Sequence, residues 1–432
     1  MKNIIILLFI CLPGYMLFPS CEDIMGDYLD KAPGVDVTED TIFTSKVQVE
    51  TFIASTYVFG IQPIFPYNDQ VYTGTYWGMS PLLSDECEAA QSYTQGQTWN
   101  QGDVTPNNII AVEDNRFLIR YKAIRMANIL MQRIGEVRDV DQSYKDQVKG
   151  EAYFIRAANY FEMFKRYGGV PIVDKKFELT DDFNVPRSTV KELVDFIISD
   201  CNQAISLLPD TYPSNMRGRA TKGAALLLKA RTLLFAASPQ FNTATPYMDM
   251  ADPANNNMIC YGNYDASRWQ LAADAAKAVL DWAPSGGVAL ITDKGVDANY
   301  RYMATIADNQ EIILSYRPVG AQPYYNMPWI PLMPYGWYSR NRGHTMTFNF
   351  LKLYEKQDGT PQVWDMGGGT DLTQKYNELD RRLKQSVTVA GGYFNADYPL
   401  MSSYVGGTYN YLCWGGNWVT KPIPPEMRRA AA

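Results

Sequence analysis

Histidine is nearly absent from this 432-residue chain, which contains only His344. A Ser-His-Asp or Cys-His catalytic arrangement, or a His-based metal site, would have to use that residue. Its neighbours Arg342, Gly343 and Thr345 show no ligand spacing, so we interpret His344 as an ordinary loop residue. The sequence also has no CxxC motif, which argues against a zinc site. We therefore expect no metal site and no cofactor.

Runs of basic residues are missing as well. The chain has 39 basic and 46 acidic residues, a net charge of -7, whereas a nucleic-acid-binding protein usually carries a basic face. We therefore expect no nucleic-acid partner. Aromatic residues are abundant instead, with 30 Tyr and 9 Trp. Many of them lie in Pro- and Gly-rich stretches outside helical patterns, where a ring is a candidate for stacking on a flat ligand face.

No apolar run is long enough to span a membrane, because the run at residues 4–12 is short and is followed by Pro and Gly. The basic Lys2, this apolar run and the small Ser20 before Cys21 are typical of a secretory signal. A cysteine at that point resembles a bacterial lipoprotein signal, and the acidic pair that follows it resembles surface-export signals of Bacteroidetes lipoproteins. We expect residues 1–20 to be a lipoprotein signal peptide and Cys21 to carry the lipid. A plain cleaved signal is the alternative.

The cysteines after the leader are widely spaced, and we interpret them mainly as small buried hydrophobic residues. They are Cys87, Cys201, Cys260 and Cys413.

Helical periodicity dominates the middle of the chain. In residues 143–167, Phe154, Phe161 and Phe164 lie on an apolar stripe with steps of three and four, and two glycines follow as a stop. Thr189 and Glu192 have the spacing of a capping box. Further helices are expected at 107–134, 189–208, 221–237 and 269–282, and in the second half of 38–58. The pattern predicts a scaffold of helix pairs, mainly at 38–60 and 107–282.

Several of these segments resemble one family. The runs GEAYFIRA at 150–157 and RYGGVP at 166–171 are similar to the signature helix of the SusD/RagB family. Other similar runs, in the same order along the chain, are TED at 38–40, VPRST at 185–189, LLP at 207–209, GRATKGAA at 218–225, SPQFN at 238–242, QEII at 310–313, YE at 354–355, DG at 358–359 and DRRL at 380–383.

This resemblance implies a mainly α fold, a tetratricopeptide-like superhelix of helix pairs with a loop-rich mixed region, within one domain at 21–432. It also implies a surface-exposed outer-membrane lipoprotein that is not an enzyme and that binds an oligosaccharide for a SusC-like TonB-dependent transporter. Family members normally continue beyond this point with a further helix pair. We expect that pair to be missing here and one helical unit to expose an apolar face.

The expected ligand region is the loop-rich part, residues 61–106 and 283–432. Within it, aromatic residues gather at 67–99 and 317–342. A sugar presents C–H faces to rings and hydroxyl groups to charged or polar side chains. By this chemistry we expect stacking and hydroxyl contacts from Trp77, Trp99, Trp329, Trp337, Tyr338, Asp85 and Arg340.

Two alternatives stay open. One is a secreted glycoside hydrolase using the cluster of Asp85, Glu86 and Glu88, although a glycosidase needs two carboxylates about 5 to 10 Å apart across the bond. The other is a helical scaffold that binds only peptide or protein.

Overall fold

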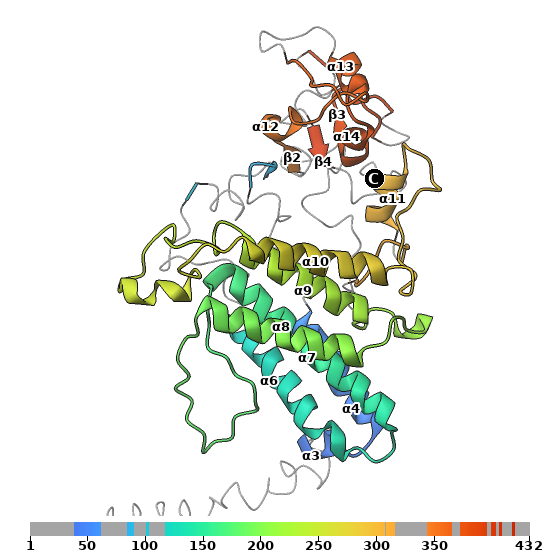
Figure 1. Ribbon diagram of the computed structural model, residues 1–432. Coiled ribbons are helices and arrows are strands. Elements are labelled where there is room, and N and C mark those ends of the chain that lie inside the picture. The colour runs from blue at the N-terminus through green and yellow to red at the C-terminus, as the bar shows by residue number, and fades with distance from the viewer. Residues whose placement is uncertain are drawn as a thin grey trace, which may run out of the picture.

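The computed structural model describes residues 39–61, 84–89, 101–102, 117–306, 308–315, 344–364, 372–394, 399–402, 406–407 and 417–419. In this part of the chain, long helices form one layer, and a group of short helices and strands lies beyond α10 (Figure 1). The long helices are stacked largely in chain order, each packing mainly on its neighbours in the sequence. This arrangement confirms the mainly α, tetratricopeptide-like prediction.

The helical layer contains α3 (Glu39–Ile42), α4 (Lys46–Gly60), α6 (Phe117–Arg133), η4 (Ile134–Glu136), α7 (Gln142–Tyr167), α8 (Val190–Leu207), η5 (Ser214–Met216), α9 (Lys222–Ala237), η6 (Pro253–Met258) and α10 (Ser267–Trp282). The remaining elements are β1 (Cys87–Ala89), α11 (Asn299–Thr305), β2 (His344–Met346), α12 (Phe348–Leu351), α13 (Leu372–Glu378), α14 (Arg381–Ser386), β3 (Val387–Val389) and β4 (Asn417–Val419). β1 pairs with β2 and β3 with β4, both antiparallel.

Local signals set the helix ends. The Asp141 side chain accepts a hydrogen bond from the backbone of Tyr144 at the start of α7. α7 is followed by Gly168, whose φ of 70° is unfavourable for other residues. At the start of α8, Thr189 and Glu192 form the expected capping box, each side chain accepting from the other residue's backbone N–H. These caps fix where each helix begins, so that its apolar stripe faces the neighbouring helices.

The cap at Thr189 provides a first test. We expect Thr189→Ala to lower the free energy of unfolding by about 1 kcal/mol, because the backbone N–H of Glu192 loses its acceptor. Urea unfolding of both proteins measures the difference. Thr180→Ala is the matched control, since Thr180 is exposed in the loop between α7 and α8. Equal effects of the two substitutions would contradict the role of the cap.

Arg156 and Asp200 form a buried ion pair in the core of the layer. Arg156 of α7 donates to both carboxylate oxygens of Asp200 of α8, at 2.7 Å each, and the two side chains are 7% and 3% exposed. The third guanidinium nitrogen donates to Asn128 of α6 at 2.7 Å and to the backbone oxygen of Asp174 at 2.9 Å. Arg156 therefore joins three helices and the loop after α7 at a point that water does not reach.

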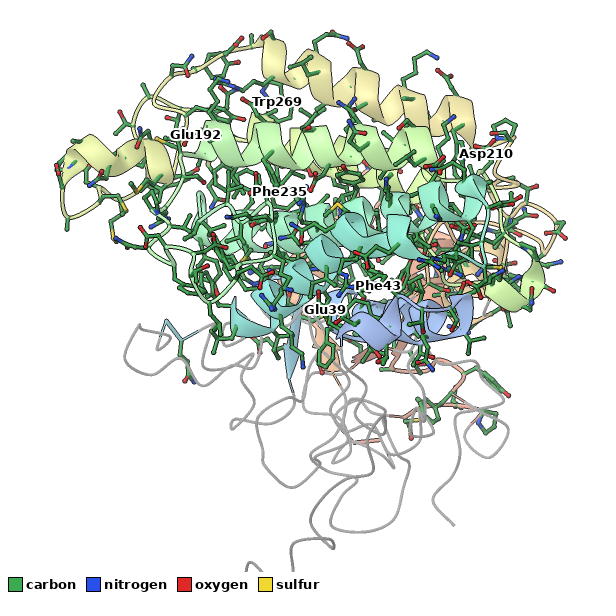
Figure 2. All side chains as sticks on the ribbon, turned by 90° about the horizontal axis from the view of Figure 1, so that it is seen from below. Glu39, Phe43, Glu192, Asp210, Phe235 and Trp269 are labelled. Atoms are coloured by element: carbon green, nitrogen blue, oxygen red, sulfur yellow. The ribbon has the colours of Figure 1, made fainter. Side chains whose placement is uncertain are left out.

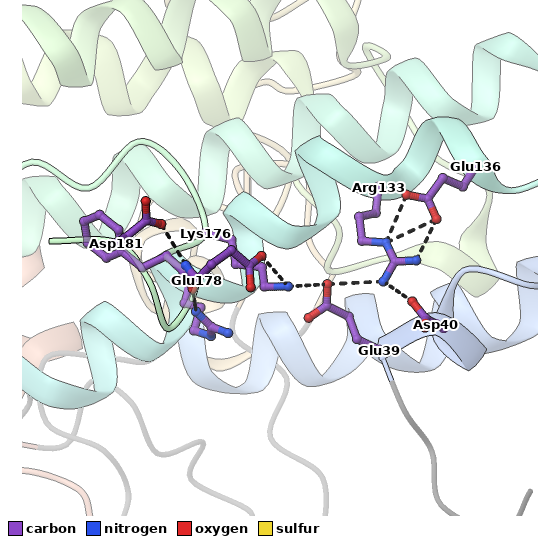
Figure 3. A network of polar contacts seen from close by, with 9 residues as sticks. Glu39, Asp40, Arg133, Glu136, Lys176, Glu178 and Asp181 are labelled. Carbon is purple, nitrogen blue, oxygen red and sulfur yellow. Dashed lines mark hydrogen bonds and ion pairs between the residues drawn. The ribbon is translucent and has the colours of Figure 1, made fainter. Parts of the chain in front are cut away.

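A second polar network fixes the start of the described chain to the layer (Figure 3). Arg133, the last residue of α6, contacts Asp40 at 2.8 Å, Glu39 at 3.3 Å and Glu136 at 2.7 Å. Glu39 is shared with Lys176 at 3.0 Å, from the loop between α7 and α8. Exposed pairs contribute little singly, but a shared network holds its members in one geometry. Figure 2 shows Glu39 and Phe43 on the opposite side of the layer from Trp269 of α10.

Three of the four cysteines expected to be buried lie in the described part of the chain. Cys87, Cys201 and Cys260 are buried and free of disulfides, which confirms the interpretation for these three. Cys413 lies outside the described residues. The outer face of α10 exposes Leu271 (53%) and Leu280 (73%).

The division of the chain into a signal peptide at residues 1–20 and one domain at 21–432 stays a prediction.

Candidate functional site

Asp85 is the one expected ligand-binding residue that the described part of the chain contains. It is exposed and lies two residues before β1. Its backbone oxygen accepts a hydrogen bond from the hydroxyl of Thr347, so its carboxylate takes no part in that contact. The other expected ligand residues, and the expected lipid attachment at Cys21, lie outside the described residues. These ligand residues are Trp77, Trp99, Trp329, Trp337, Tyr338 and Arg340.

A strand pair connects the two aromatic stretches. β1 lies inside residues 67–99, and β2 begins at His344, just after residues 317–342. The two strands are antiparallel, with Cys87 opposite Met346. Segments more than 200 positions apart in sequence are therefore held side by side by backbone hydrogen bonds, and Asp85 lies at this junction.

The described residues that come before these two stretches lie at or beside one groove. It has a volume of about 410 Å³ and is lined by Gly60 and Ile61 at the end of α4, by residues of α6, α7 and α9, and by residues 311–314. We call it the helix groove. The stretch that contains residues 67–99 follows Ile61, and the stretch that contains 317–342 follows Ser315, next to the groove. Packed helices thus hold the residues that come just before both stretches, and a helical base of this kind suits ligand-binding segments.

Charged side chains line part of the helix groove. Glu162 of α7 accepts from Lys165 at 2.7 Å and Arg166 at 3.0 Å, and Arg120 of α6 lies 3.8 Å away. Burial alone would raise the pKa of Glu162, but these cations, Lys165 above all, lower it below its usual value. Arg231 of α9 also lines the groove and is exposed. The groove lining therefore combines apolar rings with the carboxylate of Glu162 and the cations Arg120 and Arg231.

A polar hollow of about 370 Å³ shares residues 312–314 with the helix groove. In this hollow the indole N–H of Trp282 donates to Asp210 at 2.8 Å. Arg217 pairs with Asp308 at 3.3 Å. Its donors and acceptors suit the hydroxyl groups of a ligand, although many of them already bond to one another.

Two groove residues have a signal in the sequence that a search for aromatic loops misses. Glu162 and Arg231 occupy positions on the helical stripes of residues 143–167 and 221–237, where the other members are mostly apolar. A charged residue at such a position is expected to point toward a neighbouring helix or an opening. Both side chains line the groove, which explains why charge is tolerated there.

Within the residues that the structure describes, no group of three or more His, Cys, Asp and Glu side chains is placed to hold a metal ion. No helix in that part of the chain is both long and apolar enough to cross a membrane.

Comparison with known proteins finds a family model and relatives that are all SusD-like. A family model described as "Starch-binding associating with outer membrane" matches residues 27–234. A SusD-like protein of Bacteroides ovatus is 24% identical over 404 residues, which cover 92% of this chain and 60% of that protein. A SusD-like protein of Formosa agariphila is 33% identical over 106 residues, covering 24% of this chain and 20% of that protein. The chain thus spans about 60% of the length of the Bacteroides ovatus relative.

Solved structures with the same fold carry related descriptions. A SusD-like protein from Bacteroides fragilis superposes with a TM-score of 0.67 at 24% identity, over 92% of this chain and 72% of that one. A laminarin-binding SusD-like protein superposes with a TM-score of 0.57 at 17% identity, over 89% of this chain and 73% of the other. At these identities the likeness establishes the arrangement of the helices.

Proposed function

The chain belongs to the SusD/RagB family, and from this membership we propose that it captures an oligosaccharide at the cell surface for a SusC-like TonB-dependent outer-membrane transporter. In this proposal Cys21 carries a lipid that anchors the chain in the outer membrane, and the transporter takes up the glycan that the chain has bound. The chain itself binds its ligand without altering it.

One observation carries the binding proposal. Ile61 and Leu314, which precede the two aromatic stretches by six and three positions, line one cavity. The chain is brought together a second time at the β1–β2 pair. The shared groove and the strand pair each bring the two parts of the chain close together. Both therefore favour a single binding region built from the two aromatic stretches. Rings on one region can stack on consecutive sugar units, while polar groups bind their hydroxyls.

The proposed ligand contacts are divided by chemistry. Trp77, Trp99, Trp329 and Trp337 supply stacking platforms, and Tyr338 adds a ring with a hydroxyl group. Asp85 and Arg340 bind sugar hydroxyls through charged hydrogen bonds, which are stronger than neutral ones. The exposed position of Asp85 beside β1 is compatible with this role.

The test is a glycan array followed by calorimetric titration of each ligand that binds, with chromatography of the ligand after incubation. We expect saturable binding of at least one oligosaccharide and its recovery without shorter products. Release of products would favour a glycoside hydrolase. Absence of any sugar binding, with retained co-purification of the transporter barrel, would favour a scaffold that binds only protein.

A further inference from the structure

Two cations share the ring of Phe161, which lines the helix groove together with one of them, Arg231. The ammonium of Lys165 lies 4.8 Å from the centre of the Phe161 ring, and the guanidinium of Arg231 lies 5.3 Å from it. Lys165 is largely buried and pairs with Glu162 at 2.7 Å. Arg231 is exposed and forms no ion pair with any residue in the described part of the chain.

Both carboxylates that line the groove in the described part of the chain already accept hydrogen bonds from other groups. Glu162 already accepts from Lys165 and Arg166. Glu311, which also lines the groove, accepts from the backbone of Ile291 at 2.8 Å. Burial lowers the pKa of Lys165 and the nearby charge of Arg231 lowers it further, while Glu162 acts in the opposite direction. The two cations therefore repel each other, and the Lys165 side chain is only 10% exposed, so solvent screens this repulsion little.

We propose that the helix groove binds a negatively charged group of the ligand, with Arg231 as its exposed contact, so that the preferred glycan is an acidic oligosaccharide. The charged group is a carboxylate of a uronic acid or a sulfate ester. This inference rests on the proposed glycan-binding function and adds the class of glycan to it.

The geometry supports this role for Arg231. The Phe161 ring lies under its guanidinium and restricts its orientation, so that fewer rotamers are lost when an anion binds. A guanidinium can donate two parallel hydrogen bonds to a carboxylate or a sulfate. A cavity of about 410 Å³ lies in the range that small ligands occupy. An anion here would also relieve the repulsion between Arg231 and Lys165.

The experiment uses the full chain on a glycan array that contains neutral, uronic-acid and sulfated oligosaccharides of matched backbone. The best acidic binder and its neutral counterpart are then titrated at low and high salt. We expect the acidic glycan to bind about 5-fold more tightly at low salt and the preference to shrink at high salt. Arg231→Gln should remove most of this preference, and Arg231→Lys should restore part of it.

The matched control is Lys277→Gln, which removes one exposed cation from α10 outside the groove and should leave the preference unchanged. Uronic-acid and sulfated members of the array distinguish the two sources of the anion. Equal binding of acidic and neutral glycans, or a preference that survives Arg231→Gln, would overturn this inference but leave glycan binding intact. If no member of the array binds, both the inference and the proposed function fail.

Discussion

Replacing Arg156 by Met should lower the free energy of unfolding by about 3 to 5 kcal/mol, because the substitution leaves the carboxylate of Asp200 buried without its cation. The Asp200 side chain is only 3% exposed, so water cannot replace the guanidinium. Asn128 of α6 and the backbone oxygen of Asp174 lose their donor in the same step. Thermal and urea unfolding of the purified chain measure the loss.

Two further variants separate this explanation from simple loss of packing. The double variant Arg156→Met/Asp200→Leu buries no unpaired charge. We therefore expect this double variant to be more stable than Arg156→Met alone. Arg381→Met is the exposed control: its ion pair with Asp297 lies at the surface, and we expect a change of about 1 kcal/mol or less. A double variant no more stable than the single one would show that the buried charge is not the cause.

The helices could be predicted because their information is local. The stripe through Phe154, Phe161 and Phe164 predicts α7 to within a residue at each end, and Thr189 marks the residue before α8. Apolar residues at steps of three and four, with a cap before them and a glycine after them, specify one helix without reference to the rest of the chain. The same holds for Thr221 before α9.

The contacts that join the helices could not be predicted in this way. In the sequence Arg156 is one letter of a family run, whereas its partner Asp200 lies 44 positions further on and Asn128 lies 28 positions before it. Spacing in sequence says nothing about which buried charges meet, because that depends on how the helices cross. Nothing local to residues 84–89 indicated that β1 would pair with β2.

The prediction of the candidate site rests on where aromatic residues gather in the sequence. It contains no information on the positions of these side chains in space. Aromatic loop residues between prolines indicate a ligand surface, but loops have no period that fixes where a side chain points. A position on a helical stripe predicts packing for Glu162 and Arg231, although both line the helix groove. Helices can therefore contribute side chains to a site that a search for aromatic loops does not find.

The rings of both aromatic stretches should act on the same bound glycan. We expect Trp77→Ala/Trp99→Ala and Trp329→Ala/Trp337→Ala each to weaken binding by about tenfold or more, or at least about 1.4 kcal/mol, because stacked tryptophans are among the strongest contacts in binding sites. The variant with all four substitutions should bind no measurable ligand. Calorimetric titration with the best array ligand gives both the affinity and the stoichiometry.

Trp269→Ala provides the control for these four substitutions, since Trp269 is an exposed ring (42%) on α10 that does not line the helix groove. It should leave the affinity unchanged, and thermal unfolding should show that every variant folds. If only one pair of substitutions weakens binding, the ligand contacts one stretch alone. The argument from the shared groove and the β1–β2 pair would then fail, since those features can matter for binding only if both stretches reach the same sugar chain.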